Sequence, residues 1–162
     1  MSTLNPQQKL QRLALATVAA AALAIPAEGI YTRVYKDPVG ISTYCVGATT
    51  GVQANKQYAL AECMSKLSAD MSEAVQMVDR CAPDAPLSVL IAFSDAVFNL
   101  GPKIACDTKN STAARHLAAK EWKQACNELP KWDKGVVGGK LVPLPGLTKR
   151  RLAEKETCLK EA

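Results

Sequence analysis

The sequence predicts an α+β domain that is mostly helical, with a small antiparallel β-flap near the N-terminus and a buried helix at its centre. Apolar residues recur at three- and four-residue steps in several segments, which is the period of an amphipathic helix. Only residues 30–50 alternate loosely between apolar and polar and are interrupted by Gly and Pro, which is typical of short strands joined by tight turns. A length of 162 residues favours one domain with a substantial core.

The composition is that of a globular protein from an oxidising compartment. A net charge of +5 is compatible with an anionic partner such as nucleic acid, lipid or cell-wall polymer, although such a modest excess is more often just a soluble surface. The six cysteines lack the paired spacing of a zinc site, and His116 is the one histidine, so we expect no metal site. Three disulfides explain the even count better than six reduced thiols, which remain the alternative.

The N-terminal segment, residues 1–27, resembles an export signal. Lys9 and Arg12 precede an apolar run at 13–27 in which Thr17 is the one polar side chain. As a helix this run covers about 22 Å, against a hydrocarbon core of about 30 Å. Three interpretations stay open: a secretory signal cleaved near the small residues at 20–24, a weak anchor that later leaves the bilayer and packs as a helix of the domain, or a plain core helix.

The rest of the chain, residues 28–162, forms the predicted main domain. After the flap we expect an amphipathic helix, a central helix that is apolar on nearly every side and ends before Gly101, and three shorter helices, the first of them capped by Ser111. The glycines and prolines of residues 134–146 predict a loop. The expected helices span residues 59–80, 87–100, 111–119, 121–129 and 147–159.

Two carboxylates and a hydroxyl at the start of the flap suggest glycosidase chemistry. Such an enzyme needs one protonated acid for the leaving oxygen and one ionised carboxylate to assist attack at the sugar carbon. Glu28 ends an apolar helix, where desolvation favours its neutral form, whereas Asp37 lies in a turn that water can reach. We therefore interpret Glu28 as the general acid, Asp37 as base or stabiliser, and Thr43 as the holder of a water or sugar hydroxyl. By spacing alone this signal is weak, and ordinary surface charges, with Asp37 as a turn residue before Pro38, are the favoured interpretation.

The stretch EGIYTRVYKDPVGISTYCVG at 28–47 resembles the catalytic stretch of the phage-type lysozymes, the glycoside hydrolase family 24 endolysins. That pattern has Glu, eight residues, Asp, five residues and Thr, with Tyr two before the Asp and Gly three after it, and the matching residues are Glu28, Tyr35, Asp37, Gly40 and Thr43. The stretches FSDAVFNLG at 93–101 and PLPGLTKRRLAEKETCL at 143–159 are also similar to the family.

The resemblance implies a lysozyme-like fold and a muramidase that cuts peptidoglycan between N-acetylmuramic acid and N-acetylglucosamine without a cofactor. It implies Glu28 as general acid, Asp37 as the carboxylate that activates water or steadies the oxocarbenium, and Thr43 as its partner. Tyr35 and Asn99 are the expected substrate-binding residues, although Asn99 could simply mark the end of its helix. Two alternatives remain, a lytic transglycosylase on the same glycan and a non-catalytic secreted cell-wall-binding module.

The N-terminal segment is similar to that of the signal-arrest-release endolysins. The resemblance implies export to the periplasm with an uncleaved weak anchor, a transient hold on the inner membrane through residues 13–27, and release when the membrane depolarises. We expect a monomer without a nucleic-acid partner. Some relatives hold a cysteine at the position of Asp37 and are controlled by disulfide exchange, so this chain should be controlled by topology alone. Some members have Gly and His where this chain has Cys45 and Ala48.

The cysteines allow fifteen disulfide pairings, and the sequence alone does not choose among them. Their places on the predicted elements suggest Cys45–Cys63, Cys81–Cys106 and Cys126–Cys158. The basic run at 149–151 has two interpretations: it meets the anionic wall, or it lies on a solvated helix face with Glu154 as a partner.

Overall fold

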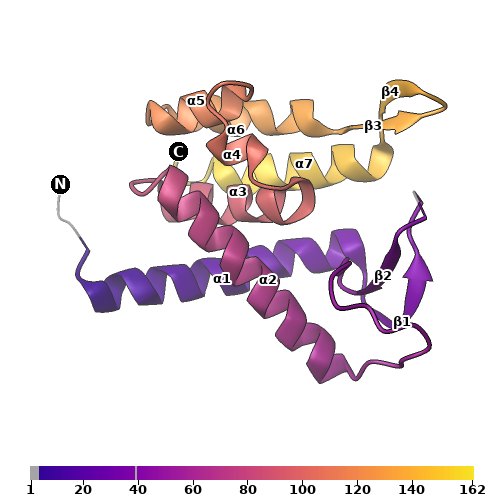
Figure 1. Cartoon of the computed structure of the whole chain (residues 1–162). Coiled ribbons are helices and arrows are strands. Elements are labelled where there is room, and N and C mark those ends of the chain that lie inside the picture. Colours follow the sequence, from indigo (N-terminus) through magenta and orange to yellow (C-terminus); the bar gives the residue numbers. More distant parts are fainter. Residues whose placement is uncertain (1–3, 39) are drawn as a thin grey trace.

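The computed structural model describes residues 4–38 and 40–162. Residues 1–3 of the N-terminal segment and Val39 of the predicted flap lie outside the described residues. Helices surround a buried central helix, and two small antiparallel sheets project from the same end of the molecule (Figure 1). The α+β prediction is confirmed. The elements are α1 Pro6–Glu28, β1 Tyr31–Lys36, β2 Ser42–Cys45, α2 Leu60–Cys81, α3 Leu87–Leu100, α4 Lys103–Cys106, α5 Thr112–Ala118, α6 Trp122–Glu128, the 3-10 helix η1 Leu129–Trp132, β3 Lys134–Val137, β4 Lys140–Pro143 and α7 Pro145–Cys158.

Helix α1 begins seven residues before the apolar run that predicted it. The Asn5 side chain accepts a hydrogen bond from the Gln8 amide and the Gln8 side chain accepts one from the Asn5 amide, both at 2.9 Å, with Pro6 in the first turn. This reciprocal capping satisfies amide groups that have no partner within the helix. Gly29 ends the helix with a φ of 72°, a conformation that favours glycine.

Alanines spaced four residues apart place α1 in the core. Ala16, Ala20 and Ala24 are fully buried, and α1 packs against α2, α3 and α7. Their small side chains form one stripe and allow close approach of the neighbouring helices. The opposite face of α1 carries Leu10 and Val18, which are 69% and 70% exposed. In the folded protein the N-terminal segment is thus a helix of the domain, with an apolar outer face.

The predicted flap is the antiparallel pair of β1 and β2. Tyr35 lies opposite Thr43, and the pairing is irregular between Tyr31 and Tyr35. A disulfide from Cys45 to Cys63 joins the end of β2 to the first turns of α2. Since β1 starts two residues after Gly29, the flap is fixed next to the end of α1 (Figure 1).

The central helix α3 is the predicted buried one. It contacts α1, α2, α4 and α7, and Val89, Leu90 and Phe93 on it are fully buried. Gly101 follows it with a φ of 82°. Ser94, also fully buried, donates to the Leu90 carbonyl of its own helix at 2.6 Å, which satisfies its hydroxyl.

The prediction that residues 134–146 form a loop is wrong. Lys134–Val137 pairs with Lys140–Pro143 as a hairpin, and α7 begins at Pro145. Gly138 and Gly139 form the two-residue turn with φ values of 57° and 78°, which suits a type I′ hairpin turn. Gly138 and Gly139, which predict a loop by composition, are therefore the residues that this turn requires. The short helix α4 was also not predicted.

Three disulfides join Cys45 to Cys63, Cys81 to Cys106 and Cys126 to Cys158. These are the pairs that the element positions suggested. The third bond fixes the end of α7 to α6 and closes a loop with a sequence separation of 32 residues. Because α7 carries the basic run 149–151, this bond also helps to hold those arginines in place.

Candidate active site

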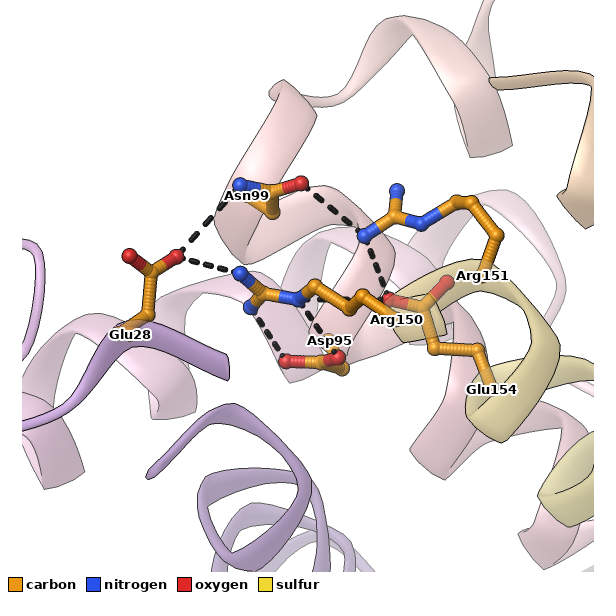
Figure 2. A network of polar contacts seen from close by, with 6 residues as sticks. All are labelled: Glu28, Asp95, Asn99, Arg150, Arg151 and Glu154. Atoms are coloured by element: carbon orange, nitrogen blue, oxygen red, sulfur yellow. Dashed lines mark hydrogen bonds and ion pairs between the residues drawn. The ribbon is translucent and has the colours of Figure 1, made fainter. Parts of the chain in front are cut away.

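Glu28 is the last residue of α1, and two other helices hold its side chain. Oε1 accepts hydrogen bonds from Arg150 Nη1 on α7 and from Asn99 Nδ2 on α3, the latter at 3.5 Å (Figure 2). The side chain is 22% exposed, whereas that of Arg150 is 4% exposed. The expectation that desolvation alone distinguishes Glu28 is thus incomplete, because a buried cation also contacts its carboxyl group.

The second oxygen of Glu28 faces the flap side. A Cβ atom added to Gly47 would lie 3.0 Å from Oε2, so this oxygen and the Gly47 backbone are neighbours. Gly47 in turn lines a hollow of about 280 Å³, together with residues of α2 and the end of α3. Oε1 is thus held by Arg150 and Asn99, while Oε2 lies next to Gly47, which lines the hollow. The other residues that line this hollow are Ala48, Thr49, Thr50, Asp70, Glu73, Ala74, Met77, Val97, Phe98, Gly101 and Pro102.

Asp37 follows β1 and lies in the turn of the flap. Its Oδ1 accepts a hydrogen bond from the Ile41 amide at 2.8 Å, and its own amide donates to the Ile41 carbonyl at 3.0 Å. The Gly40 amide donates to the Asp37 carbonyl at 2.9 Å. The carboxylate is partly exposed, as predicted for a turn that water reaches.

Thr43 is buried in β2 with an exposed fraction of 3%. Its hydroxyl donates to the Ile41 carbonyl at 3.1 Å, so Thr43 and Asp37 both bind the Ile41 backbone. Its strand partner is Tyr35. The flap therefore brings the predicted Asp37, Thr43 and Tyr35 together within one short hairpin.

Tyr35 links the flap electrostatically to Glu28. Burial raises the pKa of its phenol, and the negative charges of Glu28 and Asp37 raise it further. Its ring lies against that of Tyr31, with 4.4 Å between the centroids. Both carboxylates therefore lie within electrostatic range of one phenol, which stays protonated at neutral pH.

Behind Glu28 lies a charged network that the sequence did not predict. Arg150 binds Asp95 with two hydrogen bonds, Nε to Oδ2 at 3.1 Å and Nη2 to Oδ1 at 2.7 Å (Figure 2). Arg151 Nη2 donates to Asn99 Oδ1 at 3.0 Å and to Glu154 Oε1 at 2.6 Å. The side chains of Asp95, Arg150, Arg151 and Glu154 are all at most 4% exposed.

Both interpretations of the basic run 149–151 are thus wrong for its two arginines, which face neither solvent nor the wall, although Glu154 is a partner as expected. One signal could have indicated the network. Asp95 is the one ionisable residue in the apolar segment 87–100, and a buried charge requires a partner.

The network also has unusual protonation. Burial raises the pKa of Glu154 to about 9, and a hydrogen bond with Asp95 adds to this effect. Asp95 and Glu28 raise the pKa of Arg150, although its burial acts in the opposite direction. At neutral pH Glu154 is therefore neutral, and Arg150 contacts both Asp95 and Glu28. Within the described part of the chain, no three His, Cys, Asp or Glu residues are grouped so as to hold a metal ion.

Comparison with known proteins identifies the family of this chain. The phage lysozyme family model matches residues 26–154. The SAR-endolysin of Pseudomonas phage phiKMV is 32% identical over 155 residues, covering 93% of this chain and 91% of the relative. The SAR-endolysin of Enterobacteria phage P21 is 32% identical over 134 residues, covering 82% of this chain and 77% of the relative.

Solved structures of endolysins have the same fold. The active form of the P1 phage endolysin Lyz superposes with a TM-score of 0.69 at 26% identity, covering 89% of this chain and 86% of that one. An endolysin from Escherichia coli O157:H7 phage FAHEc1 gives a TM-score of 0.78 at 21% identity, covering 89% and 92%. Fold, motif and match over most of the sequence lead to one conclusion: this chain belongs to the phage lysozyme family.

Proposed function

We propose that Glu28, Asp37 and Thr43 carry out the reaction of this peptidoglycan-degrading muramidase, the hydrolysis of the β-1,4 bond between N-acetylmuramic acid and N-acetylglucosamine. The observation that supports this best is that the two oxygens of Glu28 have different surroundings. Oε1 is held by Arg150 and Asn99, while Oε2 lies at Gly47 beside the hollow. A carboxyl group fixed at one oxygen presents the other one in a defined direction.

In the proposed reaction, Glu28 gives its proton from Oε2 to the glycosidic oxygen as the bond from that oxygen to the sugar carbon breaks. A water molecule adds to the same carbon, and its proton returns to a carboxylate. Asp37 assists the water or stabilises the positive charge on the sugar. The turn around Ile41 holds one oxygen of Asp37 and also the Thr43 hydroxyl, so the geometry of this pair is fixed before substrate binds. These residues need no cofactor.

Tyr35 and Asn99 are the proposed substrate-binding residues. The raised pKa of Tyr35 keeps its hydroxyl protonated and available to a sugar oxygen. Asn99 has a second task. Its carbonyl oxygen accepts a hydrogen bond from Arg151, which cannot accept one, and this directs its amide nitrogen toward Glu28. Asn99 therefore supports the general acid as well as bordering the substrate site.

The proposed route to the periplasm uses α1 as a temporary anchor. Among the described residues, Pro6–Glu28 is the one helix long and apolar enough to cross a membrane. Leu10, Leu15 and Val18 remain exposed after folding, which is more apolar surface than a helix of a soluble domain needs. The boundary between segment 1–27 and domain 28–162 falls inside α1, so Glu28 reaches the site only when α1 leaves the bilayer and docks. We propose a monomer that acts on glycan strands and does not use nucleic acid.

N-terminal sequencing of the periplasmic protein tests this route. The expected result is an N-terminus that still includes Lys9 and Arg12. Cleavage within 20–24 would remove the buried alanine stripe and would contradict the proposal.

Glu28→Gln tests the catalytic assignment. The variant keeps the shape of the side chain but has no proton to donate, so release of reducing ends from purified peptidoglycan should fall by at least about a hundredfold. Circular dichroism should show an unchanged fold. A folded variant with unchanged lytic activity would overturn the assignment of Glu28 as the general acid. Anhydro-sugar ends in the wild-type digest would indicate a lytic transglycosylase instead.

A further inference from the structure

We propose that Asp95 is a positioning residue for catalysis, which acts through Arg150 to hold Glu28 and to preserve its ability to carry a proton. This rests on the proposed role of Glu28 as general acid. Asp95 does not line the hollow next to Gly47. Its partner Arg150 donates a hydrogen bond to Oε1 of Glu28. Asp95 thus binds Arg150, which in turn binds Glu28 (Figure 2).

The first step is geometric. A guanidinium group has a planar fork of five N–H donors. Asp95 binds Nε at 3.1 Å and Nη2 at 2.7 Å, which fixes the plane of the fork and leaves Nη1 directed at Glu28. Asp95 is itself fully buried on the central helix, so it is a rigid support. Without these two hydrogen bonds to Asp95, Arg150 could rotate and lose its contact with Oε1 of Glu28.

The second step is electrostatic. A cation in contact with a carboxylate favours the ionised form, and an ionised Glu28 has no proton for the leaving oxygen. Asp95 places a negative charge on the far side of the same guanidinium and so reduces the field of Arg150 at Glu28. Arg150 with Asp95 therefore acts on Glu28 as an ion pair rather than as an unshared positive charge.

The surroundings of Glu28 contain several other charged or titratable groups. Glu154, which is neutral at neutral pH because burial raises its pKa to about 9, adds no negative charge to the pair. The phenol of Tyr35 is likewise neutral. The groups near Glu28 or its partners are Asp95 on α3, Arg150, Arg151 and Glu154 on α7, and Tyr31, Tyr35 and Asp37 in and after β1. Asp70 and Glu73 of α2 line the same hollow as Gly47.

The test compares pH–activity profiles of the purified, folded full-length chain, with release of reducing ends from peptidoglycan as the readout. Asp95→Asn keeps the shape of the side chain and removes its charge. The unshared charge of Arg150 then favours ionised Glu28, so the alkaline limb of kcat/KM should move to lower pH by about one unit. Activity at acidic pH should fall less than activity at alkaline pH, because the lost support of Arg150 acts at every pH whereas the charge effect acts only on the alkaline limb. A loss that is equal at every pH would mean a merely structural role and would overturn the proposal.

Asp79→Asn is the matched control. It removes the same charge from another buried ion pair, formed with Arg12 and located toward the opposite end of α1. Its alkaline limb should stay at the wild-type position. If Asp79→Asn moves the limb as far as Asp95→Asn does, the effect is a general change of protein charge, and the specific link through Arg150 is wrong.

A double variant, Asp95→Asn with Arg150→Gln, protects the test against misfolding, because it leaves neither member of the pair as an unpaired buried charge. With the cation gone, its alkaline limb should lie above that of the wild type. A limb at the wild-type position would overturn the proposal. The Glu28→Gln variant distinguishes failure of the proposed function from failure of this inference. If Glu28→Gln stays active, Glu28 is not the general acid. If Glu28→Gln is inactive but the alkaline limbs of the Asp95 variants stay at the wild-type pH, only the role of Asp95 is wrong.

Discussion

Gly47 and Glu28 lie so close together that a Cβ atom added to Gly47 would stand 3.0 Å from Glu28 Oε2 and 3.1 Å from Cδ. The flap backbone thus forms one wall of the space around the proposed proton donor, and Arg150 forms the wall on the other side. Gly47 also has a φ of 69°, in the region that favours glycine. Both its missing side chain and its backbone conformation serve the site.

Replacing Gly47 by Ala should therefore displace Glu28. We expect kcat to fall by about a hundredfold, the effect of a misplacement of about 1 Å, with a smaller change in KM. Gly51→Ala is the control, because Gly51 has a similar φ of 72° but its added Cβ would meet only the Tyr44 hydroxyl at 3.7 Å. Both variants carry the same backbone strain. Steady-state kinetics that show equal losses for the two would contradict a specific contact with Glu28.

Asp79 should matter for the docking of α1. It pairs with Arg12 at 2.9 Å and with Lys9 at 3.1 Å, and Arg12 also donates to the Ala85 carbonyl. Asp79→Asn should lower the free energy of unfolding by about 2 kcal/mol, since it leaves a mostly buried guanidinium without its counter-charge. Asp84→Asn, which breaks an exposed pair with Lys120, should change it little. Urea unfolding of both variants measures the two losses. Equal losses would contradict a special role of the mostly buried ion pair at Asp79.

Glu154 makes a prediction about stability and pH. Its pKa is about 9 in the folded protein and 4.5 when unperturbed, so between these values the folded state holds a proton that the unfolded state has lost. The free energy of unfolding therefore falls as pH rises across this window, by up to about 1.4 kcal/mol per pH unit. Glu154→Gln does not titrate. The Tm of the variant relative to the wild type should rise steadily from pH 5 to pH 9, and a constant difference would show that Glu154 is ionised in the folded protein.

The disulfide between Cys126 and Cys158 should stabilise the network through α7. Its closed loop is the longest of the three, with a separation of 32 residues against 18 and 25. Replacing both cysteines by Ala should cost about 3 to 4 kcal/mol in the chain-entropy description. At temperatures where the variant stays folded, its alkaline limb should match the wild type. Guanidinium unfolding under oxidising conditions measures the cost, and a loss below that of the Cys45–Cys63 double variant would contradict this ranking.

The sequence by itself determined the local features of this protein. Helix periods, the Ser111 cap of α5 and the glycine after α3 depend on residues close in the chain, and the structure has them where the pattern placed them. Glu28, Asp37 and Thr43 likewise lie within one short stretch, and the resemblance of that stretch to the phage-type lysozymes, not the spacing alone, predicted their roles. The Gly138–Gly139 hairpin is also local, but its glycines were read as loop residues, since a type I′ turn and a loop share the same composition.

Only the tertiary structure decided what surrounds Glu28. Arg150 and Arg151 look like surface residues in sequence, yet both are buried, because α3 supplies Asp95 and Asn99 from more than fifty residues away. A buried charge is stable only with its partners in place, and those partners meet when three helices pack. The same holds for Asp79, whose partners come from the N-terminal segment. Periodicity reports which face of a helix is apolar, whereas the pairing of buried charges depends on how the helices cross.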